Sequence, residues 1–185
     1  MTKQQKVILI AALETLAAAA LAALLVFSLW ILCAPHTMAS AAEKTGNYSF
    51  AVTCANLKYS YTNSVDDLSR CAEDSILSGK DKFIVKYGEK LLNDTRFDKL
   101  CEKKSEKISY DYKSYICANV AVAQYRRGDL TKAIKTADSA NTEDGYIKLV
   151  LCVHEKGSAE DKAKLYNSIK NDYEQLANIL QSTGD

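Results

Sequence analysis

The feature that most constrains this chain is one long apolar stretch near its beginning, residues 7–34. From Leu16 to Ala34 the stretch contains no charged side chain. A bilayer core about 30 Å thick requires about 20 apolar helical residues. The stretch therefore predicts a helix that spans a membrane. Pro35 cannot continue the backbone hydrogen bonding of a helix and is expected to end it.

Glu14 is the one charged residue inside this stretch. A carboxylate deep in lipid costs about 3 kcal/mol on insertion scales. We therefore place the start of the lipid-embedded span at about Leu16 and Glu14 among the headgroups. The alternative role for Glu14 is a polar contact with another helix inside the membrane.

The basic residues beside the stretch predict its orientation. Lys3, Lys6 and the N-terminal amine precede it, whereas only His36 and Lys44 lie near its other end. By the positive-inside rule the N-terminus is cytoplasmic and the remainder extracytoplasmic, either periplasmic or extracellular. We expect a single-pass plasma-membrane protein, with the lipid bilayer as one partner and residues 1–35 as cytoplasmic stub and signal-anchor helix.

Three processing signals compete with a retained anchor. Ala39-Ser40-Ala41 has the small residues of a signal-peptidase site, which makes cleavage after Ala41 an alternative. The apolar run is longer than the about 7 to 15 residues of a cleavable signal, and this favours retention. Cys33 follows Leu32 rather than the small residue of a lipoprotein signal. The run also lacks the Gly-Phe-type junction that precedes the Glu of type IV pilins.

The rest of the chain has the pattern of a helical domain. Residues 36–46 (HTMASAAEKTG) are small and polar and predict a linker before a domain of residues 47–185. No proline follows Pro35, and apolar residues recur at helical spacing. The predicted helices cover about 48–61, 64–79, 81–92, 96–108, the two halves of 112–140, about 146–157 and 159–180. Ser64-x-x-Asp67 has the form of a capping box at the start of the second of these.

Tyr112 to Ala140 is the most informative part of this domain. Arg127-Gly128-Asp129 predicts a turn between two helices that small residues allow to pack closely. This pattern resembles one tetratricopeptide repeat of about 30 residues, carried by Ala118, Tyr125, Gly128, Ala133 and Ala137. Gly79 and Gly157 stand at comparable turns. The resemblance implies an all-α fold in which a degenerate solenoid of about three helical hairpins follows the transmembrane helix. An unrelated helical bundle is the alternative.

Five cysteines follow the apolar stretch, and four of them are placed symmetrically about predicted turns. In an antiparallel hairpin, residues equidistant from the turn face one another. Cys54–Cys71 and Cys101–Cys117 are therefore the expected disulfides, which an extracytoplasmic compartment permits. Cys152 remains as a buried thiol, with an intermolecular bridge or a Cys117–Cys152 bond as alternatives.

Catalytic and cofactor motifs are missing from the sequence. It has two histidines, no Gly-rich phosphate loop and no spacing typical of a metal site. We therefore expect no enzyme, no cofactor and no metal. The whole chain carries 24 Lys and Arg against 23 Asp and Glu, and this balance argues against nucleic-acid binding. The eleven tyrosines could line a protein-binding groove or fill space between helices.

These observations predict a membrane-anchored extracytoplasmic helical-repeat protein that binds another protein. It resembles bacterial inner-membrane proteins with a periplasmic tetratricopeptide domain, which act as adaptors or chaperones. The rival is a small structural subunit of a membrane or cell-surface assembly, self-associating as a homo-oligomer through its domain and Cys152.

Overall fold

The computed structural model describes residues 3–182, and within this range the chain forms eleven helices and no strand. The helices are α1 (Lys3–Cys33), α2 (Pro35–Lys44), α3 (Tyr48–Thr62), α4 (Val65–Ser78), α5 (Asp81–Leu92), α6 (Phe97–Ser105), α7 (Tyr112–Arg126), α8 (Leu130–Asp138), α9 (Asp144–Lys156), α10 (Ala159–Ile169) and α11 (Glu174–Ile179). The N-terminal amine and the side chain of Lys3, used above to predict orientation, lie outside the described part. So do residues 183–185 of the predicted domain.

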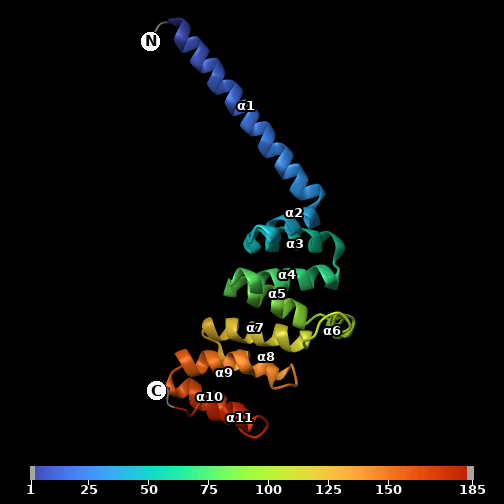
Figure 1. Ribbon diagram of the computed structural model, residues 1–185, viewed down its shortest axis with the longest axis vertical. Coiled ribbons are helices and arrows are strands. Elements are labelled where there is room, and N and C mark those ends of the chain that lie inside the picture. Colours follow the sequence, from blue (N-terminus) through green and yellow to red (C-terminus); the bar gives the residue numbers. More distant parts are fainter. Residues whose placement is uncertain (1–2, 183–185) are drawn as a thin grey trace.

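Helix α1 is long and apolar, and before its last two turns it is uncovered by the rest of the described chain. It projects away from the other helices (Figure 1). Its segment Gln4–Cys33 is long and apolar enough to cross a membrane, and none of its most apolar part is buried. A signal sequence would satisfy the same test of length and composition. The exposure does distinguish α1 from the core helix of a soluble protein, because such a helix would be covered by its neighbours.

Residues 35–44 form a helix and not the predicted linker. Pro35 occupies the first turn of α2, where the missing N–H of proline costs nothing. Met38, Ala39 and Ala42 are buried, and α2 packs along α3. The prediction failed because these buried side chains are mostly small, so hydropathy alone did not distinguish the helix from a polar connection.

The remaining helices form a stack in which neighbours in sequence are neighbours in space. Helix α3 packs on α4, α4 on α5, α5 on α7, and α7 on both α8 and α9. Figure 1 shows these layers succeeding one another, with α1 and the C-terminal helices at opposite ends of the molecule. Helix α6 lies beside this sequence of layers, contacting α4 and α7.

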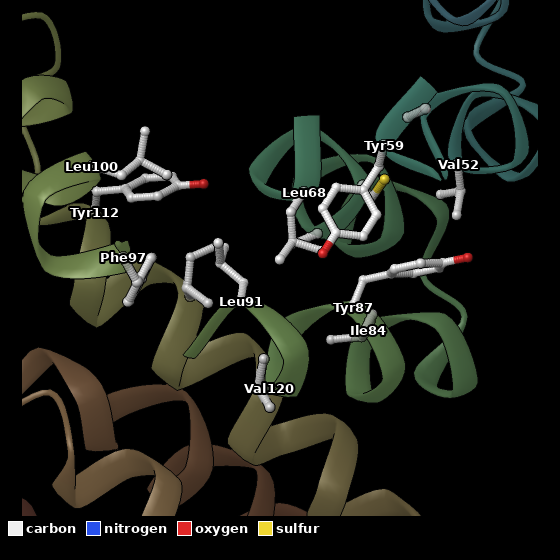
Figure 2. Packing of buried hydrophobic residues seen from close by; sticks show 14 of the residues in the cluster. Val52, Tyr59, Leu68, Ile84, Tyr87, Leu91, Phe97, Leu100, Tyr112 and Val120 are labelled. Atoms are coloured by element: carbon white, nitrogen blue, oxygen red, sulfur yellow. The ribbon is translucent and has the colours of Figure 1, made fainter. Parts of the chain in front are cut away.

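Two apolar clusters hold the stack together. The first joins α3, α4, α5, α6 and α7 around Leu68, Leu91 and Tyr112 (Figure 2). The second joins α7 to α11 around Leu149, Val153 and Leu165. Helix α7 contributes residues to both, and Ile116 and Ala121 of this helix are completely buried. This burial against both clusters explains why most of the middle of α7, residues 116–124, is apolar and buried.

Two glycines allow close helix packing. A Cβ on Gly88 of α5 would lie 2.1 Å from Cγ2 of Val120 on α7. A Cβ on Gly145 of α9 would lie 2.6 Å from the carbonyl oxygen of Ala137 on α8. Neither position has room for a larger residue, so the α5–α7 and α8–α9 distances depend on glycine.

The boundaries of most predicted helices agree with the structure, and the exceptions have physical causes. Helix α6 ends at Ser105, before the predicted Ile108. The predicted helix 159–180 is broken into α10 and α11. This break lets Ile169 and Leu176 both reach the second apolar cluster.

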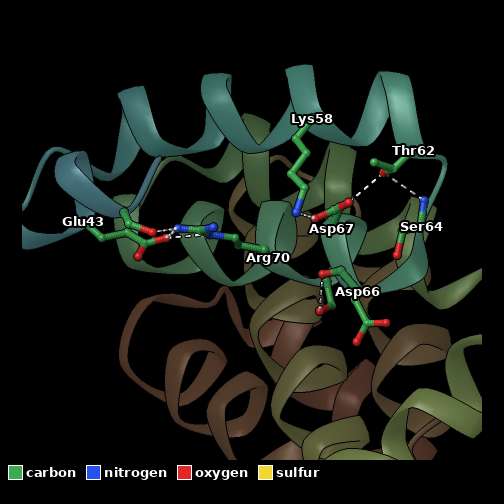
Figure 3. Close-up of polar contacts among 9 residues, drawn as sticks. Glu43, Lys58, Thr62, Ser64, Asp66, Asp67 and Arg70 are labelled. Atoms are coloured by element: carbon green, nitrogen blue, oxygen red, sulfur yellow. Dashed lines mark hydrogen bonds and ion pairs between the residues drawn. The ribbon is translucent and has the colours of Figure 1, made fainter. Parts of the chain in front are cut away.

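The predicted capping box at Ser64 is not formed. The Ser64 side chain makes no capping hydrogen bond. Thr62 takes its place: its hydroxyl donates to Asp67 Oδ2 at 2.6 Å and accepts from the Ser64 N–H at 3.2 Å (Figure 3). Asp67 also pairs with Lys58 of α3 at 2.9 Å. Burial raises the pKa of Asp67, but the hydrogen bonds from Thr62 and Lys58 outweigh this and leave the pKa below its usual value.

Candidate binding groove

Two adjoining hollows lie where α7 and α9 pack side by side. One measures about 370 Å³ and the other about 380 Å³, and Arg126 and Cys152 line both. We call them together the α7–α9 groove. Its lining residues come from α4, α5, α7, α8, α9 and α10 and from the turns at Gly79 and Gly128: Ile76, Gly79, Asp81, Ile84, Asn119, Val122, Ala123, Tyr125, Arg126, Gly128, Leu130, Lys148, Leu151, Cys152, Glu155, Lys156 and Asp161.

Helical spacing explains how the sequence builds this groove. Helix α7 contributes residues at positions i, i+3, i+4 and i+7, which share one face of a helix: Asn119, Val122, Ala123 and Arg126. Helix α9 contributes a second such set: Lys148, Leu151, Cys152 and Glu155. On each helix two charged or polar residues flank two apolar ones. The groove therefore has an apolar floor between polar ends.

The depth of the groove differs along this floor. Val122, Ala123 and Cys152 are buried, whereas Leu151 stands on the rim with 51% of its surface exposed. Ile147, one turn earlier on α9, is 37% exposed. These two side chains make the rim of the groove apolar along α9.

The charged groups of the groove are only partly paired within the chain. Arg126 Nη1 lies 3.7 Å from Asp81 Oδ1, and that oxygen is buried without a hydrogen-bond partner. Half of the Arg126 side chain is exposed. Lys148 Nζ donates to Asn119 Oδ1 at 2.9 Å. The Tyr125 hydroxyl donates to Asp161 Oδ2 at 3.3 Å, and burial together with this carboxylate raises the pKa of Tyr125.

This set of groups is suited to recognition. An apolar floor bordered by both signs of charge can receive an apolar side chain and pair with polar groups around it. His154 of α9 instead faces the C-terminal segment, where its Nε2 lies 3.1 Å from the Ser182 carbonyl oxygen. Within residues 3–182, no three His, Cys, Asp or Glu residues are grouped so as to hold a metal ion.

A hollow separate from the α7–α9 groove, of about 570 Å³, lies at the junction of α2, α3, α4 and α6. Arg70 of α4 reaches α2 there: its Nη2 lies 2.6 Å from Glu43 Oε1 and 2.8 Å from the Ser40 hydroxyl oxygen (Figure 3). Asp74, one turn further along α4, is only 3% exposed, and its Oδ2 has no hydrogen-bond partner. Burial and the neighbouring Glu43 carboxylate raise the pKa of Asp74 to about 7.

The predicted disulfides are not formed in the structure, because all six cysteines are free thiols. Equal distance from a turn places two residues at the same height but does not fix which way each one faces. Cys54 faces Met38 and Ala39 of α2, while Cys71 lies in the larger cluster with α5 and α7.

Cys101 and Cys117, the second predicted pair, are also free thiols in the structure. Cys117 is buried with its sulfur 3.4 Å from the Ser139 hydroxyl oxygen. Cys101 is half-buried against the first cluster. Burial raises the pKa of both thiols, that of Cys101 to about 11. Cys152, predicted as a buried or intermolecular thiol, is a free thiol in the groove with 8% of its surface exposed.

The residues that carried the repeat pattern lie on α7, on α8 and at the turn between these helices. Ala118, Ala133 and Ala137 are buried. Gly128 has φ +89° at the turn, which favours glycine. The Asp129 side chain caps α8 by accepting from the Lys132 N–H at 2.9 Å.

Glu14 and most tyrosines have other surroundings than a groove. Glu14 is exposed on α1. Tyr61 and Tyr110 are the exposed tyrosines of the chain, and both lie away from the α7–α9 groove. Tyr59, Tyr87, Tyr112 and Tyr146 are buried between helices. The structure therefore favours tyrosine as a packing residue over a tyrosine-lined groove.

Sequence reasoning missed the groups that join α2 to α4. Arg70 and Asp74 lie one helical turn apart and so share a face, but nothing in the sequence indicated that Glu43 would lie opposite them.

A capping box was also missed: Ser158 and Asp161 form a reciprocal one at the start of α10. Its Ser-x-x-Asp pattern directly after Gly157 was the signal that could have identified it.

No protein-family model matches this sequence, and comparison with curated proteins finds no significant relative.

Proposed function

We propose that this protein is a single-pass membrane protein whose extracytoplasmic helical domain binds another protein, in an adaptor or chaperone-like role. The observation that carries the proposal is the contrast between α1 and the stack. The apolar side chains of α1 are uncovered, whereas the stack has its own closed clusters. An exposed apolar helix of this length is costly in water and favourable in a bilayer.

The stack supports a degenerate tetratricopeptide-like solenoid. Successive helices pack as neighbours, and α7 and α8 meet at a glycine turn with small residues between them. Solenoids of this type present extended surfaces that bind segments of other proteins. Because only one repeat has a clear sequence pattern, the proposal for the other hairpins rests on their packing order.

Helix α2 supports retention of the anchor. Cleavage after Ala41 would remove Pro35, Met38 and Ala39, which are buried. It would also remove the Ser40 hydroxyl that accepts from Arg70. The domain would therefore lose part of its packed structure, which argues that residues before Ala42 belong to the mature protein.

The α7–α9 groove is the proposed binding surface. We expect its apolar floor to receive an apolar side chain of the partner beside Leu151. The exposed guanidinium of Arg126 would pair with an acidic group next to that side chain, since Arg binds carboxylates through two parallel hydrogen bonds. We propose neither a nucleic-acid partner nor a cofactor for this protein.

The experiment is photocrosslinking in intact membranes. A photoreactive residue replaces Leu151 in one full-length variant and Leu77 of α4 in a matched control. Both positions are exposed leucines, at 51% and 55%, but Leu77 lies outside the groove. We expect one defined protein to be captured from position 151 and not from position 77, and Arg126→Ala to reduce this capture.

Two outcomes would contradict the proposal. Capture of a second copy of this chain from position 151 would favour the rival role, a structural subunit of a larger assembly. Equal capture from both positions would show that the groove has no special role in binding.

A further inference from the structure

Helix α1 is attached to the domain by contact as well as by the chain. Ala34 is the one residue between α1 and α2. The ring of Phe27 stacks on that of Phe50 in α3, with centroids 6.3 Å apart and planes 13° apart. Ile31 packs on the small cluster of Met38, Ala39 and Cys54. The last two turns of α1 are therefore docked on the α2–α3 layer, and no flexible linker separates them.

These contacts fix the height of the domain along α1. Phe27 lies about 9 Å before Cys33 along the helix axis, at 1.5 Å per residue. Phe50 is in contact with Phe27, so it lies at the level of a residue well inside α1. A bilayer that surrounds α1 up to the level of Phe27 must consequently also reach the first turns of α3.

The residues around Phe50 indicate how deep this region can lie. Asn47 caps α3, and Thr53 is exposed one turn after Phe50. Such polar groups are disfavoured in the hydrocarbon core but not among headgroups. Trp30, 51% exposed on the adjoining turn of α1, is of the residue type that is enriched at membrane interfaces.

Given the membrane anchor proposed above, we propose that the α1–α3 junction, formed by Phe27, Trp30, Ile31 and Phe50, lies in the extracytoplasmic interface of the bilayer. Phospholipid headgroups and upper acyl chains cover its exposed side. The domain is thereby held on the membrane surface.

This placement changes the expected span of α1. Counting about 20 residues back from Phe27 puts the start of the hydrocarbon-embedded segment near Ile8, not at Leu16. Glu14 then lies about 20 Å along the helix from Phe27, below the headgroups. A polar contact to another membrane helix becomes the favoured role of Glu14, because a carboxyl group in hydrocarbon needs a partner.

The chain's single tryptophan makes the test direct. The full-length protein is reconstituted in phosphatidylcholine vesicles whose lipids carry bromine, a fluorescence quencher, either near the headgroup or near the chain end. Native Trp30 reports insertion of α1. In a Trp30→Phe background, Phe50→Trp places the fluorophore at the junction, and Leu151→Trp places it in the α7–α9 groove as a matched control.

We expect headgroup-proximal bromine to quench the Phe50→Trp indole nearly as strongly as Trp30, and more than chain-end bromine does. The Leu151→Trp indole should keep its full emission. Thr53→Trp, at an exposed position on the next turn, should behave like Phe50→Trp and guards against a local packing defect.

The opposing results are distinct. If Trp30 is quenched but the Phe50→Trp and Thr53→Trp indoles emit like the control, the domain stands clear of the bilayer and this inference is wrong. If chain-end bromine quenches them more, the interfacial depth is wrong. If Trp30 itself is not quenched, the membrane anchor of the proposed function fails.

Discussion

Asp74 is a buried carboxyl group that lies near a second carboxyl group, that of Glu43 on α2. Burial is the main cause that raises its pKa to about 7, and the negative charges of Glu43 and Glu73 add to it, while Arg70 opposes them. In the folded protein Asp74 therefore keeps its proton at a pH where an ordinary Asp is ionised. This proton lies in the same contact by which Arg70 holds Glu43.

Asp74→Asn should therefore change the pH dependence of stability. The pKa of Asp74 is about 3.9 in the unfolded chain and about 7 in the folded one. Between these values the folded state binds more protons, so the free energy of unfolding of the native protein falls as pH rises from about 4 to about 7. The variant lacks this loss, so it should gain stability relative to the native protein across that window.

Urea unfolding at a series of pH values measures this difference. Asp66→Asn is the matched control, since Asp66 is exposed on the same helix. A constant difference between native and Asp74→Asn proteins from pH 4 to pH 8 would show that Asp74 does not hold a proton in the folded state.

At the scale of elements, the helices with strong terminal signals were predictable. Gly79 ends α4 with φ +64°, and the apolar spacing after it gave the bounds of α5 correctly. Helix α2 was not predicted, because most of its buried residues are small and give the sequence little apolar character. The break between α10 and α11 has no Gly or Pro, since it arises from packing against the second cluster.

The candidate site was less predictable than the helices. The faces of α7 and α9 that form the groove could be derived from periodicity, but their pairing depends on Gly145 and on the α8 packing that places α9 beside α7. The four cysteines that symmetry about the turns paired are free thiols in the structure, and distance from a turn alone does not determine side-chain direction. Which helices pack together, and which of their side chains meet, depends on tertiary contacts that the pattern of a single sequence does not predict.

Helix α2 offers a direct test of its structural role. Ala39 is fully buried against α3, whereas Ala41 is exposed on the same helix. An uncompensated buried charge costs about 3 to 5 kcal/mol, so Ala39→Asp should destabilise the domain by about that amount. Ala41→Asp should stay within about 0.5 kcal/mol of the native protein. Thermal unfolding of the two full-length variants measures the contrast, and equal behaviour would indicate that residues 36–46 are a linker after all.

At the scale of the whole molecule, the two ends of the structure differ in the surface that they offer. The α1 end presents an uncovered apolar helix, and the stack presents a groove with both signs of charge at the α7–α9 contact. The proposed function depends on this difference, because it places α1 in lipid and the stack in water. The formal net charge of +1 for the whole chain adds no strong attraction for nucleic acid.

The central claim is that α1 remains attached and holds the domain outside the cytoplasm. Protease treatment of intact cells, followed by mass spectrometry of the membrane fraction, tests it most directly. We predict that the untreated membranes contain a chain that still includes α1, and that external protease shortens it to a membrane-retained fragment containing α1. A chain that begins at Ala42, one that is found in the soluble fraction, or one whose domain resists external protease in intact cells but not in lysed cells would contradict the account.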